Sequence, residues 1–255
     1  MPTTTSRPLS KLPEITLAFW VMKICATTLG ETAGDLLSMT LKVGYAASSL
    51  LLLGIFCITL GAQLRSKTYN PLLYWAVILS TSTAGTTLSD FMDRTLGLGY
   101  ATGSAILASL LCAVLVYWKL SQKSLSIAHV RSGKQELLYW GAILVSNTLG
   151  TALGDFLADS SGLGFAGGAL LIAGLIALIV AAYYLTGISR VALFWMAFVL
   201  TRPLGATAGD LLTKPVAAGG MNLGTAGASA VLLMILLITI GYTSWQARRV
   251  TMQSA

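Results

Sequence analysis

Residues 20–35 read WVMKICATTLGETAGD, and the pattern of this stretch returns three more times along the chain. In each copy a Trp is followed fifteen residues later by an Asp, and the nine residues that end on the Asp follow one pattern. The later copies end in STAGTTLSD, NTLGTALGD and RPLGATAGD, with the pairs Trp75/Asp90, Trp140/Asp155 and Trp195/Asp210. Recurrence in one register predicts a structural unit that is present four times.

The composition around these copies is that of a chain inside a lipid bilayer. Of the 255 residues, 55% are hydrophobic and 10% are charged, and the mean hydropathy is +0.78, whereas a soluble domain carries about 25% charged residues. We expect no cleavable signal peptide, because the first apolar segment is too long for one. Apolar spans of about 20 residues, enough to cross a bilayer core, are expected at 15–37, 45–64, 71–92, 100–118, 137–157, 165–185, 190–212 and 225–245. The sequence therefore predicts an all-α integral membrane protein with eight transmembrane helices.

The positive charges predict how these helices are oriented. The turns within helix pairs hold three basic residues, Lys42, Arg94 and Lys214. The termini and the connections between pairs hold eleven: Arg7, Lys11, Arg65, Lys67, Lys119, Lys123, Arg131, Lys134, Arg190, Arg248 and Arg249. The positive-inside rule then places both termini in the cytoplasm and the Asp-bearing ends of the helices on the other side. This placement also accounts for the net charge of +7 without nucleic-acid binding.

The spacing of the copies predicts two halves. Successive Asp residues are 55, 65 and 55 residues apart, so the extra residues fall in the middle of the chain. We expect repeats 1 and 2 in residues 1–122, a polar cytoplasmic linker at 123–136, and repeats 3 and 4 in residues 137–255. His129 lies in the linker and is expected to be solvated. Because every unit crosses the membrane twice, the four two-helix repeats are parallel and pseudo-symmetric about the membrane normal.

Small residues accompany each Asp. Gly30, Gly85, Gly150 and Gly205 lie five positions before it, and Gly34, Ser89, Gly154 and Gly209 lie one position before it. Small residues at this spacing let helix backbones approach closely. They also weaken a helix, so two alternatives remain open: tight packing alone, or packing with local unwinding of the kind that binds ions in transporters.

Polar residues recur on the same face of each first helix, because residues four apart are neighbours on a helix. Four positions before the Asp stand Glu31, Thr86, Thr151 and Ala206, and eight positions before it stand Thr27, Ser82, Asn147 and Arg202. Lys23 lies one turn further back and is the other basic residue of these segments. We predict that Lys23 and Arg202 compensate acidic charge, although Lys23 is also close enough to the cytoplasmic interface to reach water.

The acidic residues are the candidate ligands for an ion. An ionisable group at membrane depth is costly, so several in one register favour a functional site. With Glu31 and the four Asp residues against Lys23 and Arg202, the balance is three negative charges. Mg²⁺ and Mn²⁺ prefer carboxylate and other oxygen ligands. The predicted metal ligands are Asp35, Asp90, Asp155, Asp210 and Glu31, supported by the oxygens of Thr27, Ser82, Thr86, Asn147 and Thr151. The alternative is that the Asp residues are hydrated at the outer interface.

The phrases GETAGD, GTTLSD, GTALGD and GATAGD resemble those of a poorly characterised bacterial family of multi-pass membrane-anchored proteins with four repeated GxTxGD-like motifs. The resemblance covers nearly the whole chain and implies a bacterial inner-membrane protein without implying an activity. The E-x-G-D motifs of manganese and calcium exporters are similar too, but GETAGD lacks their spacing and no Lys-Thr follows it.

The leading functional hypothesis is a secondary transporter, exporter or channel for an inorganic cation such as Mn²⁺ or Mg²⁺, with possible proton coupling. One alternative is a carrier of a small anionic or organic solute that uses Lys23 and Arg202, and another is a scaffold or sensor subunit that transports nothing. We see no nucleophile–base pair, nucleotide motif or zinc signature and expect neither an enzyme nor a resident cofactor. Cys25, Cys57 and Cys112 lack metal-ligand spacing and are expected to be small buried hydrophobes. Beyond the lipid bilayer and the transported solute no partner is predicted, and a monomer and a homodimer both remain open.

Overall fold

The computed structural model describes residues 12–127, 130 and 132–253. Arg7, Lys11, His129 and Arg131, to which the sequence assigns cytoplasmic or solvated positions, lie outside the described residues.

Eight long helices make up the described chain. They are α1 (Leu17–Asp35), α2 (Tyr45–Arg65), α3 (Pro71–Asp90), α4 (Tyr100–Gln122), α5 (Gly133–Asp155), α6 (Gly164–Leu185), α7 (Arg190–Thr213) and α8 (Thr225–Gln253). Each lies on one of the eight expected spans. Helix α5 begins four residues earlier than expected and takes in the end of the predicted linker at 123–136. The reason is a capping box, in which Ser132 accepts a hydrogen bond from the backbone of Gln135 and the Gln135 side chain accepts one in return.

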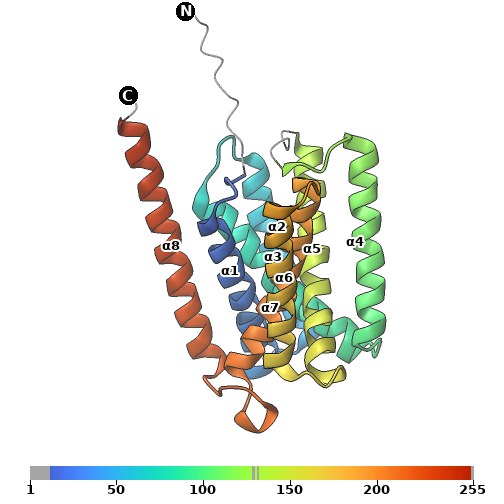
Figure 1. Ribbon diagram of the computed structural model, residues 1–255. Coiled ribbons are helices and arrows are strands. Elements are labelled where there is room, and N and C mark those ends of the chain that lie inside the picture. Colours follow the sequence, from blue (N-terminus) through green and yellow to red (C-terminus); the bar gives the residue numbers. More distant parts are fainter. Residues whose placement is uncertain (1–11, 128–129, 131, 254–255) are drawn as a thin grey trace, which may run out of the picture.

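The first helices of the four pairs form a closed inner ring. Helix α1 packs on α3, α3 on α5, α5 on α7, and α7 on α1 again. The second helices lie outside this ring, and each packs mainly against the first helix of the following pair: α2 on α3, α4 on α5, α6 on α7 and α8 on α1. The start of α1 and the end of α8 lie at one end of the bundle, and the turns within the pairs lie at the other (Figure 1).

The small residues of the inner helices make the ring tight. A Cβ on Gly30, Gly85, Gly150 or Gly205 would lie within 2.2–2.9 Å of an atom of Ser82, Asn147, Arg202 or Thr27, respectively, on the next inner helix. Real Cβ contacts are not that short, so these helices can approach only where no side chain stands between them. The inner helices stay α-helical through these glycines, and tight packing without unwinding is therefore what the structure shows.

The backbone widens only after the Asp residues. A five-residue π-helical turn follows Asp35, Asp90 and Asp155, at Leu36–Thr40, Phe91–Thr95 and Phe156–Ser160. The fourth pair differs, because α7 runs past Asp210 to Thr213 and a short 3₁₀ turn at Val216–Ala218 follows.

The outer helices expose apolar surface over most of their length. Leu50, Leu170 and Ile238 are among the large apolar side chains without cover. Six of the eight described helices are long and apolar enough to cross a membrane, and α1 and α3 are the two that fall short. Both contribute polar side chains to the inside of the ring. The described helices are compatible with a multi-pass membrane protein.

Two of the three cysteines differ from expectation. Cys25 on α1 is buried, but Cys57 and Cys112 are exposed. They lie on α2 and α4, against whose outer faces no described helix packs, so their apolar surroundings in the sequence do not translate into burial.

Candidate functional site

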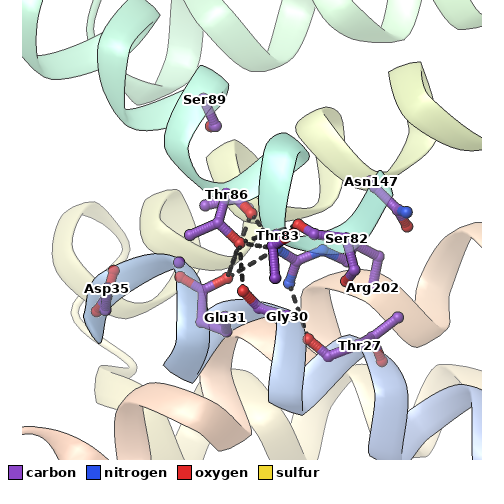
Figure 2. Close-up of polar contacts among 12 residues, drawn as sticks. Thr27, Gly30, Glu31, Asp35, Ser82, Thr83, Thr86, Ser89, Asn147 and Arg202 are labelled. Atoms are coloured by element: carbon purple, nitrogen blue, oxygen red, sulfur yellow. Dashed lines mark hydrogen bonds and ion pairs between the residues drawn. The ribbon is translucent and has the colours of Figure 1, made fainter. Parts of the chain in front are cut away.

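An ion pair joins the first and last inner helices at the centre of the ring. Arg202 on α7 and Glu31 on α1 approach to 2.9 Å, and their side chains are 0% and 3% exposed. The same Arg202 nitrogen donates to the hydroxyls of Thr86 and Thr151, which lie within 3.3 Å of the Glu31 carboxylate. All four inner helices therefore meet at this point (Figure 2).

The replacement of one polar residue by Ala makes room for this arrangement. Glu31, Thr86, Thr151 and Ala206 occupy equivalent positions four before the Asp, and Arg202 reaches them from the position one turn below. Ala206 is fully buried. Because the fourth copy has only a methyl group at this level, the guanidinium extends from its own helix to the three polar groups of the others.

The polar residues eight before the Asp line the level of Arg202. Thr27 donates a hydrogen bond to the carbonyl of Thr201 on α7 (3.1 Å), and the Asn147 amide donates to Thr81 (2.9 Å). Arg202 also donates to the carbonyl of Ser82 (3.4 Å). The structure thus brings together the residues that the sequence selected at the two levels below the Asp residues.

Lys23 lies one turn further from the Asp end and is fully buried. Its ammonium nitrogen lies 4.3 Å from the centre of the Phe198 ring, and it has no hydrogen-bond partner among the described residues. Lys23 therefore does not reach the outside of the bundle, because α1 turns its side chain into the ring. A cation above an aromatic face gains attraction from the ring electrons, but an acidic partner at this level is absent from the described part of the chain.

The four Asp residues are bridged in pairs by two basic residues that the sequence had assigned to the turns. Lys214 lies 2.7 Å from Asp35 and 3.1 Å from Asp210. In the other half of the ring, Arg94 lies 2.9 Å from Asp90 and 3.2 Å from Asp155. Each base stands four residues after an Asp of its own copy, and this i, i+4 spacing was the signal in the sequence. The acidic excess is therefore smaller than the sequence estimate.

The Asp residues are buried, with 2–3% exposure each, so hydration at an interface does not describe their surroundings. Lys214 lies beyond the end of α7 and its side chain is 23% exposed. Burial lowers the pKa of Lys214, but the carboxylates of Asp210 and Asp35 outweigh this effect and hold the pKa above its ordinary value. Lys214 is thus a firmly charged ammonium group in a gap between two carboxylates.

The five predicted metal ligands fall into two groups. Oxygens of Glu31, Asp35 and Asp210 all lie within 4.8 Å of one another, and the three residues are buried. Asp90 and Asp155 lie on the other side of the ring with Arg94 between them. Glu31, four positions before Asp35, adds a third carboxylate to the group of Asp35 and Asp210. The residues four positions before Asp90 and Asp155 are Thr86 and Thr151, which carry no charge. Within the described residues, one trio of carboxylates has the geometry to share a cation.

A family model described as Repeat of Unknown Function (DUF347) matches four consecutive segments of the chain, residues 18–69, 73–124, 138–189 and 193–249. The chain belongs to this family. Each segment starts near the Trp of one copy and covers most of its helix pair, so the prediction of a poorly characterised family with four repeats is confirmed. The GxTxGD-like phrases as its signature stay a prediction. Comparison with curated proteins and with solved structures found no match.

In the DUF347 repeats, the Trp that marks each copy belongs to an aromatic pair. Phe19, Tyr74, Tyr139 and Phe194 directly precede the four Trp residues. Each of these four rings contacts the Trp of the next copy. The distances between ring centres are 5.8 Å to Trp75, 5.5 Å to Trp140, 6.4 Å to Trp195 and 5.7 Å to Trp20. The FW and YW doublets are the signal of this contact in the sequence, and the Trp-to-Asp interval alone does not predict it.

This aromatic collar closes the bundle at the end away from the Asp residues. The Tyr74 and Tyr139 hydroxyls share a hydrogen bond of 2.7 Å inside it. Between the collar and Arg202, the level of Lys23 contains Ile78, Ile143 and Phe198, which are all fully buried. The polar interior therefore starts at the Asp residues and ends against packed rings and branched side chains.

Proposed function

We propose that this protein crosses a bacterial inner membrane eight times and carries an inorganic cation through it. The membrane part of the proposal is supported by the six helices that meet the length and apolarity of a span. Helices α1 and α3 are more polar, but they stand in the inner ring behind α8 and α2. Helices of 19 or more residues extend about 30 Å, the thickness of a hydrocarbon core.

The same arrangement supports an orientation with cytoplasmic termini. Three basic residues lie at the end of the bundle that carries the turns within pairs, and two of them, Arg94 and Lys214, are ion-paired with the Asp residues. The other end keeps Arg65, Lys67, Lys119, Lys123, Lys134 and Arg190 in its connections. Positive charge at the cytoplasmic face then favours an Asp site that opens toward the opposite face. All four repeats are parallel in this topology, about an axis along the membrane normal.

One observation carries the cation proposal: three buried carboxylates, on Glu31, Asp35 and Asp210, have oxygens within 4.8 Å of one another. They come from α1 and α7, two helices that are distant in sequence, so local chain geometry alone does not require them to meet. Carboxylate oxygens are the ligands that hard cations prefer. The hydroxyls of Thr86 and Thr151 hold the Glu31 carboxylate in place from the other two inner helices.

Charge balance favours a divalent ion. The three carboxylates face two positive charges, Arg202 on Glu31 and Lys214 between the two Asp residues, and one negative charge is left over. A divalent cation in place of the Lys214 ammonium would bring the net charge of the three carboxylates, Arg202 and the ion to zero. Lys214 is able to leave because its flexible side chain is held mainly by the two carboxylates, with one weak contact to the Met39 sulfur (3.9 Å), is partly exposed and lies just beyond the helix end. We infer that Lys214 is a tethered cation that Mn²⁺ or Mg²⁺ displaces on binding.

The closed end of the polar interior favours a carrier over an open channel. The carboxylates lie near one end of the bundle, and the collar from Phe19 to Trp195 seals the other. A solute released on the far side would need this collar to open. Protons exchanging at the crowded carboxylates would supply the coupling, as repeated intramembrane acids do in other transporters.

The other readings of the sequence fit these contacts less well. An anion bound at the terminal nitrogen of Arg202 that faces the ring would have to displace Glu31, Thr86 and Thr151, which all contact that nitrogen. A scaffold would use the Asp residues to hold helices together through Arg94 and Lys214 alone. It would need Glu31 as the partner of Arg202, but it would not need the Glu31 carboxylate oxygens to lie within 4.8 Å of those of Asp35 and Asp210.

Matched Asp variants test the proposal, because the two halves of the ring differ in the third carboxylate. The purified protein is titrated with Mn²⁺ and Mg²⁺ while its melting temperature is followed, and uptake of the same ions is measured in proteoliposomes. We expect saturating metal to stabilise the wild type by about 2–3 kcal/mol at 100 times Kd. We expect Asp35→Asn to lose most of this shift and most of the uptake, and Asp90→Asn to keep the shift.

Three outcomes would contradict this assignment. A wild type that neither gains stability nor takes up a divalent ion excludes the cation function. Equal losses in Asp35→Asn and Asp90→Asn exclude the trio as the site. Lower folding yield in every Asp variant, without any metal effect, supports the scaffold.

A further inference from the structure

An apolar pocket of about 580 Å³ opens between α1, α6 and α7, at the end of the bundle where α1 begins. Its walls include Trp20 and Ile24 from α1, Ile179 and Tyr183 from α6, and Phe194 and Ala197 from α7. The volume lies within the range of about 300–1,000 Å³ found for sites that hold small molecules.

The pocket exists because the third copy lacks a side chain that fills the equivalent groove of the second. There, Trp118 of α4 is 1% exposed and packs on Tyr139 at 6.4 Å and on Trp195 at 5.6 Å. The equivalent residue, 28 positions after the Asp of the third copy, is Tyr183. Tyr183 is 47% exposed, and Phe194 and Trp20, the equivalents of Tyr139 and Trp195, are left to line the pocket.

The outer end of the pocket carries a positive charge. Arg190, the first residue of α7, is exposed, and its guanidinium carbon lies 4.1 Å from the centre of the Tyr183 ring. Among the described residues it is the one formally charged side chain that lines the pocket, and the remaining polar groups there include the side chains of Thr16, Ser126 and Thr201. An apolar cavity with one cation at its mouth complements an amphiphile with an anionic head.

We propose that this pocket binds an anionic glycerophospholipid of the bilayer, with an acyl chain between α6 and the α1–α7 seam and the phosphate on Arg190. The proposal rests on the membrane location proposed above and not on cation transport. Arginine pairs with phosphate through parallel hydrogen bonds. Basic residues at the cytoplasmic surface also attract anionic lipids, and Arg190 lies at the end of the bundle assigned to that side.

The lipid would contact the seam at which the ring closes. Ile24 and Thr201 line the pocket, and each directly follows or precedes a charged residue of the interior, Lys23 or Arg202. The Thr201 carbonyl accepts the hydrogen bond from Thr27 that joins α7 to α1. A bound acyl chain would therefore support the junction of the first and fourth repeats from outside.

Quenching of Trp fluorescence tests the proposal, because Trp20 is the Trp that lines the pocket. The full-length protein is reconstituted in vesicles of phosphatidylcholine that contain a fraction of brominated lipid, either phosphatidylglycerol or phosphatidylcholine. We expect brominated phosphatidylglycerol to quench more, and Trp20→Phe to remove the difference. We expect Arg190→Gln to weaken the preference about fivefold, and Lys119→Gln, which removes an exposed charge at the same end of the bundle, to keep it.

Equal quenching by the two brominated lipids in the wild type would overturn the proposal. So would equal effects of Arg190→Gln and Lys119→Gln, since the preference would then reflect overall positive charge. No metal is present in the measurement, so a failure here leaves the cation result unaffected, and a failure of cation uptake leaves this one unaffected.

Discussion

Replacing Arg202 by Met tests the ion pair at the centre of the ring. At 2.9 Å, two unit charges attract each other by about 6 kcal/mol at an effective dielectric constant of about 20. Met has a similar length and no charge, so the variant leaves Glu31 buried with Thr86 and Thr151 as its partners. Loss of one member of a buried pair costs about 3–5 kcal/mol. We expect Arg202→Met to lower the free energy of unfolding by about 3–5 kcal/mol.

A second substitution should restore most of the stability that Arg202→Met loses. Glu31→Gln in the Arg202→Met background replaces the carboxylate by a neutral amide of the same shape, which still accepts hydrogen bonds from Thr86 and Thr151. Neutral groups of similar volume often replace a buried ion pair without cost. We therefore expect the two substitutions to be coupled by about 2 kcal/mol or more.

The measurement is a double-mutant cycle on the purified protein. The wild type, both single variants and the double variant are unfolded in mixed micelles by rising dodecyl sulfate, and helix content is followed by circular dichroism. Residues that do not interact have additive effects to within about 0.5 kcal/mol. A coupling energy below that value would refute the reasoning, because the stability of buried Glu31 would then not depend on Arg202.

Further predictions concern packing and can be measured by the same unfolding assay. Gly150→Ala places a methyl group against Arg202 and should cost about 1–3 kcal/mol, whereas Gly141→Ala on the same helix meets nothing within 4 Å and should be neutral or stabilising by up to about 1 kcal/mol. Equal effects of the two would contradict the close approach of α5 and α7. Tyr74→Phe should cost about 1–3 kcal/mol by leaving the Tyr139 hydroxyl unpaired, and Tyr139→Phe in addition should restore stability; additive losses would exclude the shared hydrogen bond. Trp118→Ala should cost about 3–5 kcal/mol, and a loss below about 1 kcal/mol would contradict its burial.

Much of the fold could be predicted because the repeat is written in the sequence. The Trp-to-Asp interval and the eight apolar spans locate seven of the eight described helices to within about four residues at each end, whereas α8 runs to Gln253, past its expected end at 245. The pairing of helices could not be predicted in this way. An outer helix such as α2 has small residues that would suit its own partner or the next one equally well, and only closure of the ring places it on α3.

The sequence predicts which residues belong to the candidate site, but it does not predict which of them contact each other. The i−4 and i−8 positions selected Glu31, Thr86, Thr151 and Arg202 correctly as neighbours. The direction in which a long side chain reaches is set by its surroundings, so sequence alone did not place Arg202 one level above its own position. Nor did it show Lys23 turned inward. The sequence places Lys214 and Arg94 in turns, where basic residues are usually solvated, and only their position four residues after an Asp indicates the ion pairs.

The Glu31–Arg202 pair also decides which halves can assemble with each other. Each repeat contacts the next through the same kinds of residue, and the fourth contacts the first in the same way, so packing alone would accept the units in other orders. A ring made from two copies of residues 1–122 would bury two glutamates at that level and no arginine, and a ring made from two second halves would bury two arginines and no glutamate. An unpaired buried charge costs several kcal/mol. We therefore expect the ion pair to make assembly selective: a half packed on a second copy of itself would bury two like charges without a partner, whereas a first half packed on a second half pairs them.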